Sequence, residues 1–309
     1  MPVNNLSLAL SDIQSDVLRV GEDRSLRDEI NFDERADSID FIGFHIVDRI
    51  NGLLQMGESG TALYELKQQA EAQIGALAAI DTNLFARLRE NIRTGVYTGS
   101  SFRHMAAKYV RFDLDGSDWL YKIGYDNLDV FIDGLLSYQV VPEPTARLEP
   151  EMIFLQKTPA RIIFQLVELA GLKEEDVFFD IGAGLGQAAL LVNLLSGASA
   201  RGIEYEPVYC SYATNCALAL NLPNVEFINS DARKADYTEG TVFFMYTPFK
   251  GRMLQDMLEI LKKESQKRAI RIFTYGPCSP ELGQQSWLHC ENGTPDDFYK
   301  LYLFTSLQQ

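Results

Sequence analysis

Three glycines at alternate positions, Gly182, Gly184 and Gly186, follow a short apolar run that contains one carboxylate, Asp180. Glycines in such a turn let a bound molecule approach the backbone closely at the open edge of an α/β sheet. A dinucleotide-binding fingerprint needs a third glycine three positions after the second, but Gln187 stands there. The G-x-G-x-G spacing therefore indicates a ligand-binding turn and weakens the dinucleotide interpretation.

Asp180 is unusual because it stands inside an otherwise apolar segment, VFFDI at 177–181. A buried carboxylate costs free energy unless a partner compensates its charge. A cation on a bound molecule would supply that partner. The turn and the carboxylate together predict a small-molecule site at the end of this segment.

The elements that must position this site alternate between strands and helices along the second half of the chain. Such alternation implies right-handed crossovers and a doubly wound, mostly parallel α/β sheet. The tail, SWLHCE and DFYKLYLFTS, suggests a terminal antiparallel hairpin. We predict strands at 177–181, 200–204, 225–229, 241–246 and 269–275, and helices at about 159–170, 185–195, 207–220 and 251–263.

The first half of the chain has a different texture. Apolar residues recur at three- and four-residue spacings in GTALYELKQQAEAQIGALAAI and NLFARLRENI, which is typical of helices. Four prolines between 140 and 159 then disfavour regular structure and suggest an extended connector across the surface. We therefore predict an N-terminal helical domain at 1–139, a connector at 140–158 and an α/β domain at 159–309. We expect the helical domain, together with the connector, to form a lid that caps the site and selects its substrate.

Composition restricts the function. The formal net charge of −15 repels polyphosphate backbones, so general nucleic-acid binding is not expected. The four cysteines form no CxxC pair and the three histidines are widely spaced, which gives no zinc-binding pattern. No signal peptide or run of about 18 apolar residues is visible. We expect a soluble, reduced, cytoplasmic protein without a metal or membrane anchor.

The chain resembles the class I S-adenosylmethionine-dependent methyltransferases, whose first motif places an acidic residue two positions before a G-x-G-x-G turn, as Asp180 is placed. The resemblance implies a seven-stranded Rossmann-like methyltransferase sheet. It also implies that Glu204, in RGIEYEP, takes both ribose hydroxyls, and that Asp231, in NSDAR, receives the adenine amino group. The backbone N–H of Ala232 would meet a ring nitrogen, and Tyr205 would pack on the adenine face.

Residues 150 to about 260 look more narrowly like the non-SET lysine methyltransferases of the disruptor-of-telomeric-silencing type. There the glycine turn is followed by glutamine, as by Gln187, and a threonine precedes the helix before the first strand, as Thr158 does. The resemblance implies that both contact the methionine end of the cofactor. The chain lacks that branch's asparagine-rich loop and basic tail, so nucleosome methylation is not expected.

The loop MYTPF, after the predicted fourth strand, departs from the [N/D]-P-P-[Y/F] signature of methyltransferases that act on planar amino groups. Tyr246 and Thr247 replace its first two residues, while Pro248 and Phe249 remain. Tyr246 and Phe249 could wall an acceptor pocket, and aromatic faces attract cations. The expected function is methyl transfer to a protein side chain or a small molecule. The alternatives are a non-catalytic S-adenosylmethionine-binding scaffold or sensor, and an NAD(P)-dependent oxidoreductase.

Overall fold

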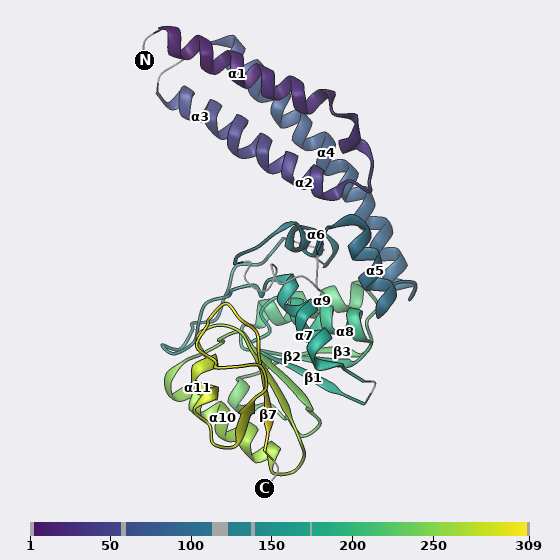
Figure 1. Cartoon of the computed structure of the whole chain (residues 1–309), viewed down its shortest axis with the longest axis vertical. Coiled ribbons are helices and arrows are strands. Elements are labelled where there is room, and N and C mark those ends of the chain that lie inside the picture. The colour runs from purple at the N-terminus through teal and green to yellow at the C-terminus, as the bar shows by residue number, and fades with distance from the viewer. Residues whose placement is uncertain (1–2, 57–59, 113–122, 137–139, 174, 308–309) are drawn as a thin grey trace. The chain divides into compact units, whose positions relative to one another are not determined.

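The computed structural model describes residues 3–56, 60–112, 123–136, 140–173 and 175–307 (Figure 1). The chain divides into two compact units. We call residues 1–88 and 106–111 the helical unit, and residues 89–105 and 112–309 the sheet unit. A cap formed by residues 1–139 stays a prediction.

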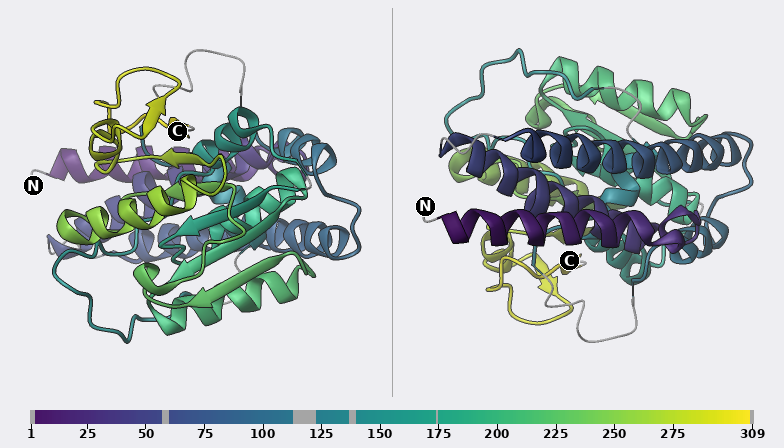
Figure 2. Two further views of the ribbon diagram at one scale, coloured as in Figure 1. Left: turned by 90° about the horizontal axis from the view of Figure 1, so that it is seen from below. Right: turned by 90° about the horizontal axis from the view of Figure 1, so that it is seen from above.

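The helical unit is built from antiparallel helices packed side by side (Figures 1 and 2). Their apolar faces meet in a core that includes Ile13, Ile46 and Leu63. Its elements are α1 (Val3–Glu22), a short 3₁₀ turn (Arg24–Arg27), α2 (Phe32–Phe41), a π-helical turn (Ile42–Val47), α3 (Asp48–Gln55) and the first part of α4 (Thr61–Arg93). The two apolar helical patterns seen in the sequence are therefore parts of one helix, α4, which continues into the sheet unit.

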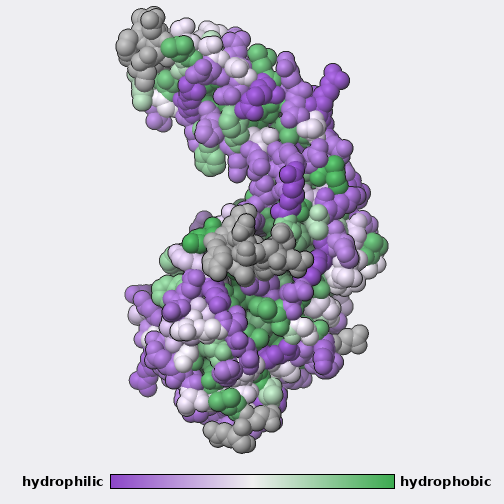
Figure 3. All heavy atoms as spheres, viewed as in Figure 1, coloured by the Kyte–Doolittle hydropathy of each residue, from purple (hydrophilic) through white to green (hydrophobic). Residues whose placement is uncertain are grey.

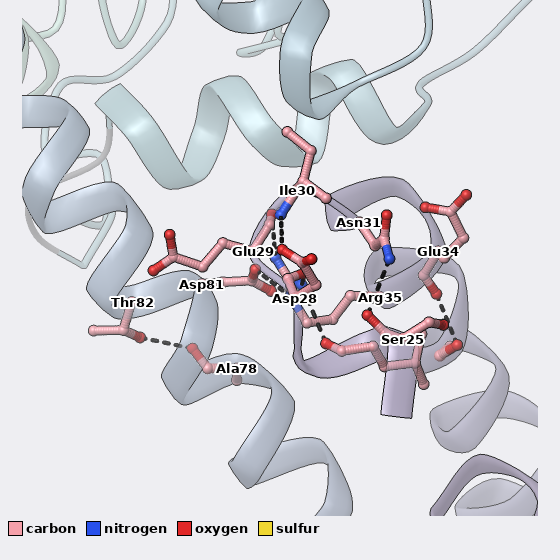
Figure 4. A network of polar contacts seen from close by, with 12 residues as sticks. Ser25, Asp28, Glu29, Ile30, Asn31, Glu34, Arg35, Ala78, Asp81 and Thr82 are labelled. Carbon is pink, nitrogen blue, oxygen red and sulfur yellow. Dashed lines mark hydrogen bonds and ion pairs between the residues drawn. The ribbon is translucent and has the colours of Figure 1, made fainter. Parts of the chain in front are cut away.

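A buried arginine ties the turn between α1 and α2 to α4 (Figure 4). The side chain of Arg35 is fully buried, and its Nε donates to Oδ1 of Asp81 at 2.7 Å. Nη1 donates to the carbonyls of Leu26 and Asp28, and Nη2 to that of Glu29. The turn thus wraps around one guanidinium, whose charge the Asp81 carboxylate compensates.

We expect Asp81→Ala to destabilise the helical unit by about 3 to 5 kcal/mol, because it leaves the Arg35 guanidinium buried without its carboxylate. Urea unfolding measures this cost. The exposed Glu65, on the same helix, provides the control Glu65→Ala. An equal effect of the two substitutions would contradict a structural role for the pair, whereas replacing both Arg35 and Asp81 by apolar residues should restore much of the stability.

The sheet unit contains a seven-stranded sheet in the order β3-β2-β1-β4-β5-β7-β6. Its first five strands are parallel, and the last two form the antiparallel hairpin expected from the tail. The mostly parallel α/β sheet predicted from the sequence is thus confirmed. The strands are β1 (Val177–Ile181), β2 (Ser199–Glu204), β3 (Val225–Asn229), β4 (Val242–Met245), β5 (Arg271–Thr274), β6 (Leu288–Cys290) and β7 (Tyr302–Ser306).

Helices cover both faces of this sheet (Figures 1 and 2). Side chains on one face, among them Phe179 and Phe243, form a core with α10. Alternate residues such as Asp180 point to the opposite face, where α8 contacts β1 and β2. The helices are α5 (Ser100–Tyr109), shared with the helical unit, α6 (Asn127–Leu136), α7 (Ala160–Ala170), α8 (Gln187–Ser196), α9 (Pro207–Ala219), the 3₁₀ turn η4 (Ala232–Lys234), α10 (Gly251–Ser265) and α11 (Ser279–Gly283).

On the face seen in Figure 3, polar residues predominate over the helical bundle, and apolar residues are scattered among them. Within the part of the chain that the structure describes, no helix has the length and apolar character needed to cross a membrane.

Candidate functional site

A cavity of about 400 Å³ lies at the carboxyl ends of β1, β2 and β4, within the sheet unit. This volume is in the range of small-molecule sites. Parallel strands bring the ends of β1, β2 and β4 to one edge, so residues far apart in the sequence meet there. Of the predicted site residues, the cavity is lined by Thr158, Asp180, Gly182, Gly184, Gln187, Glu204, Tyr205, Asp231, Ala232, Tyr246 and Phe249.

The glycine turn is shaped by positive backbone φ angles and by close neighbours. Gly182 has φ +81°, and a Cβ placed on it would lie 2.4 Å from Cβ of Pro248. Gly186 has φ +84° and packs against the ring of Phe227 instead of lining the cavity. Ordinary side chains disfavour this backbone region and would not fit here. The structure thus places Gly182 at the cavity wall and Gly186 behind it.

Glu204 is a buried carboxylate at the end of β2 that already holds the glycine turn. Its Oε2 accepts from the backbone N–H of Gly184 at 2.6 Å, and its Oε1 accepts from that of Glu206 at 2.7 Å. Burial raises the pKa of Glu204, although these hydrogen bonds act in the opposite direction. Each carboxylate oxygen keeps a second lone pair, so Glu204 can also accept from hydroxyl groups of a ligand.

Asp180 is 4% exposed and has no hydrogen-bond or ion-pair partner among the described residues. Burial, assisted by the charge of Glu204, raises its pKa to about 7. A cation that enters the cavity stabilises the charged form of a buried carboxylate of this kind. Asp180 is therefore the group whose environment most strongly indicates the charge of a ligand.

Asp231 has partners of its own. Its Oδ1 caps η4 by accepting from the backbone N–H of Arg233, and its carboxylate forms an ion pair with the Arg233 side chain at 2.7 Å. That side chain holds the pKa of Asp231 below its usual range. Arg233 also pairs with Glu149 at 3.0 Å. Asp231 thus lines the cavity and, through Arg233, anchors the segment that contains Glu149.

Gln187 and Thr158 are brought together, as both line the cavity and Nε2 of Gln187 donates to the Thr158 carbonyl at 3.0 Å. Thr158 is the last residue of the connector and lies two positions before the start of α7. The side chain at the start of α8 therefore holds the connector against the glycine turn.

The connector was expected to cross the surface and to form a lid together with the helical half, and in the structure its own residues line the cavity. Residues 140–158 contain no helix or strand, yet many residues between Pro144 and Thr158 line the cavity. The buried carboxylate of Glu206 accepts from Thr145 N at 2.9 Å, Thr145 Oγ1 at 2.8 Å and Ala146 N at 2.6 Å. Glu151 in turn accepts from Met253 N at 2.8 Å and thereby caps α10.

The sequence contains part of the signal for the hydrogen bonds of Glu206. Glu206 followed by Pro207 is a helix N-cap sequence, and Glu206 does accept from the N–H of Val208 at the start of α9. Nothing local indicates that the same carboxylate also binds residues about sixty positions earlier. What the sequence did not predict is therefore this contact between Glu206 and the connector.

We expect Glu206→Ala to release the connector from α9 while the sheet stays folded. Hydrogen exchange of Thr145 and Ala146 should become faster, and ligand binding should weaken by about tenfold, because one hydrogen-bonded clamp is lost. Burial opposes ionisation of Glu206, but its hydrogen bonds prevail and lower its pKa. The clamp should therefore persist at neutral pH and weaken only when the pH falls below the usual titration range of a glutamate. Unchanged exchange in the variant would contradict this role.

The loop after β4 forms the remaining wall. Thr247 has φ +42°, a backbone conformation that β-branched residues rarely adopt. Its Oγ1 donates to the carbonyl of Tyr275 at 3.3 Å and accepts from the N–H of Cys278 at 3.2 Å. The ring of Tyr246 lies 5.0 Å from that of Tyr275. A strained residue held by its neighbours is common at functional sites, and here it aims Tyr246 and Phe249 at the cavity.

No protein-family model matches the chain, and the comparison with curated proteins gives no match either. Similar solved structures include an RNA methyltransferase from Salinibacter ruber in complex with S-adenosyl-L-homocysteine, at 23% identity over 50% of this chain and 95% of that chain, with a TM-score of 0.40. A putative methyltransferase from Escherichia coli is 18% identical over 51% of this chain and 91% of that chain, with a TM-score of 0.41.

A further similar structure is a SAM-dependent methyltransferase from Aquifex aeolicus, which is 19% identical over 48% of this chain and 93% of that chain, with a TM-score of 0.39. At these identities and scores, the chemistry of the cavity has to be understood from this chain's own residues.

Proposed function

We propose that the sheet unit binds S-adenosylmethionine and that the protein transfers the methyl group to an acceptor. The observation that carries this proposal is Asp180, a buried carboxylate that has no partner among the described residues and lines a cavity together with Glu204 and Asp231. A methionine moiety carries an ammonium group, a ribose carries two neighbouring hydroxyls, and adenine carries an amino group. The three carboxylates offer one acceptor for each of these groups.

The residues present fit this cofactor. Asp180 would take the ammonium group, Thr158 and Gln187 the rest of the methionine end, and Glu204 the ribose hydroxyls. The adenine ring would lie near Tyr205, Asp231 and Ala232. When bound, the cofactor supplies a methyl group on a sulfonium, which an acceptor attacks in an in-line displacement.

The chain's own contribution to such a transfer is positioning and exclusion of water. The glycine turn brings the backbone close to the ligand, and the connector covers the cavity. Burial raises the pKa of Tyr246 to about 12, so its hydroxyl stays protonated at neutral pH and acts as a hydrogen-bond donor. Tyr246 and Phe249 therefore position an acceptor, and neither acts as a base.

The proposal is tested by titrating the purified protein with S-adenosylmethionine, S-adenosylhomocysteine and NADH in parallel calorimetric experiments. We expect the first two to bind and NADH not to bind. Glu204→Ala and Asp231→Ala should weaken binding by about tenfold or more, whereas Glu226→Ala, an exposed acid on β3, serves as the control. Unchanged affinity in folded Glu204→Ala and Asp231→Ala variants would show the proposed pocket to be wrong.

An enzyme and a non-catalytic sensor are separated by a second measurement, acceptor-dependent release of S-adenosylhomocysteine. Saturable binding without any release over a broad acceptor panel would favour the sensor. Selection of the acceptor by the helices at 1–139 belongs to the proposal as well. It predicts that surface substitutions in those helices change acceptor preference and leave cofactor affinity unchanged.

A further inference from the structure

Helix α6 and the residues just before it hold the end of the connector, although no residue of α6 lines the cavity. The hydroxyl of Tyr125 donates to the carbonyl of Lys157 at 2.7 Å. Nζ of Lys157 donates to both carboxylate oxygens of Asp133, each at 2.7 Å. Lys157 itself lines the cavity. The main chain and the side chain of this cavity residue are therefore both held by groups that lie outside the cavity wall.

A third contact from α6 caps α7. The start of a helix leaves its first N–H groups without partners, and the N-cap residue of α7, Pro159, makes no side-chain cap hydrogen bond. Asp129 caps α7 from the neighbouring helix, since its Oδ1 accepts from the N–H of Ala160 at 2.7 Å. Its Oδ2 accepts from the N–H of Asp126 at 2.8 Å. Asp129 is only 7% exposed, so this cap is shielded from water and fixes the start of α7 against α6.

Because Asp129 caps α7, the hydroxyl of Thr158 is not needed for that purpose, although a threonine before a proline is a favourable cap sequence. Thr158 is 8% exposed and lines the cavity. Its hydroxyl has no hydrogen-bond partner among the described residues, yet the oxygen keeps accessible surface. Its carbonyl accepts from Nε2 of Gln187 at 3.0 Å. The main chain around Thr158 is thus fixed while its hydroxyl stays available to a ligand.

We propose that Asp129, Asp133 and Tyr125 are positioning residues for the methionine end of the cofactor. They act through Thr158, whose hydroxyl donates to the carboxylate of that end while Asp180 takes its ammonium group. A hydrogen bond to an ionised acceptor is strong but depends on geometry, and a binding group contributes fully only when it is held within about 0.5 Å of its place. This inference rests on the proposed binding of S-adenosylmethionine and extends it to residues outside the cavity wall.

Recognition of the methionine end can be measured apart from the rest of the cofactor. S-adenosylhomocysteine carries this end, whereas 5′-methylthioadenosine keeps the adenine, the ribose and the sulfur but lacks the amino and carboxylate groups. A general change in the shape of the pocket weakens the binding of both ligands, but misplacement of Thr158 weakens only that of the first. The ratio of the two dissociation constants, measured by calorimetry, is therefore a quantity that a merely structural role would not change.

We expect the parent to bind S-adenosylhomocysteine about tenfold or more tightly than 5′-methylthioadenosine, because only the first ligand offers charged groups to Thr158 and Asp180. Tyr125→Phe and Asp133→Asn should each weaken S-adenosylhomocysteine binding by about two- to fivefold. Asp129→Asn should weaken it by about tenfold or more, because an amide offers one acceptor oxygen where the carboxylate uses two. All three variants should bind 5′-methylthioadenosine as the parent does.

A double-mutant cycle tests whether these residues act through Thr158. Thr158→Val removes the hydroxyl, keeps the shape of the side chain and should weaken S-adenosylhomocysteine binding by about tenfold. In this background Asp129→Asn should cause little further loss, since the hydroxyl that it misplaces is already absent. Val130→Ala, at an exposed position of α6, is the matched control and should bind both ligands with the affinities of the parent.

An unchanged ratio of the two dissociation constants in the three folded positioning variants would overturn the inference. Full additivity of Asp129→Asn with Thr158→Val would do so as well. Equal affinity of the parent for the two ligands would also overturn it and would leave the adenosine part of the proposed site in place. If the parent binds neither ligand, the proposed function itself fails. Tyr125→Phe and Asp133→Asn change exposed side chains, so they decide the question even if Asp129→Asn does not fold.

Discussion

We expect Asp180→Asn to weaken S-adenosylmethionine binding by about 10- to 100-fold, because the variant loses the negative charge that would pair with the ammonium group of the cofactor. The same substitution should stabilise the ligand-free protein at pH 8. Burial raises the pKa of Asp180 to about 7 in the folded protein, from an ordinary value of 3.8. Folding therefore takes up a proton between these two pH values, and the stability of the parent falls as the pH rises across that interval.

The variant lacks this proton uptake, so its stability relative to the parent should rise by about 2 to 3 kcal/mol between pH 5 and pH 8. Urea unfolding without ligand at both pH values measures the difference. Asp256→Asn, an exposed position on α10, controls for the general loss of one negative charge. A relative stability of Asp180→Asn that does not change with pH would mean that Asp180 titrates normally in the folded protein.

Calorimetric titration of the parent protein with S-adenosylmethionine tests the protonation of Asp180 in a second way. A bound cation favours the charged form of Asp180 and lowers its pKa. S-adenosylmethionine binding at pH 6 should therefore release close to one proton, which appears as a dependence of the binding heat on the ionisation heat of the buffer. This dependence should nearly vanish at pH 8, where Asp180 is already mostly ionised, and at both pH values in Asp180→Asn.

Sequence patterns predicted the sheet unit well because its strands are marked by short-range signals. The apolar runs at 177–181 and 225–229 coincide with β1 and β3, and the alternating tail forms the antiparallel pair β6 and β7. Most candidate site residues follow strand ends, and a parallel sheet brings strand ends to one edge. Their meeting in one cavity thus follows from the order of the elements.

What the sequence did not reveal depends on contacts between distant segments. Glu206 holds the connector through Thr145 and Ala146, and Gly186 faces Phe227 although it shares the spacing of the glycines beside it. Arg161 would pass for an ordinary surface residue of an amphipathic helix, and only tertiary packing shows that it is buried. Such roles are set by which surfaces meet, which local periodicity does not encode.

Gly182→Ala is expected to be the most damaging single-methyl change in the site. The added Cβ would lie 2.4 Å from Cβ of Pro248, and the backbone at φ +81° disfavours any side chain. The backbone conformation alone costs about 1 to 2 kcal/mol. To relieve the overlap, the turn after β1 must also move away from the loop after β4. We expect destabilisation by about 3 to 5 kcal/mol in total and loss of measurable S-adenosylmethionine binding.

Gly197→Ala separates these two contributions. Gly197 has φ +78°, close to that of Gly182, but nothing lies within 4 Å of a Cβ placed there. The control should therefore show only the backbone cost in urea unfolding and should bind S-adenosylmethionine with the affinity of the parent. Equal destabilisation by the two substitutions would mean that Pro248 moves aside at little cost. Retained binding in Gly182→Ala would mean that the ligand does not need the close approach of these two loops.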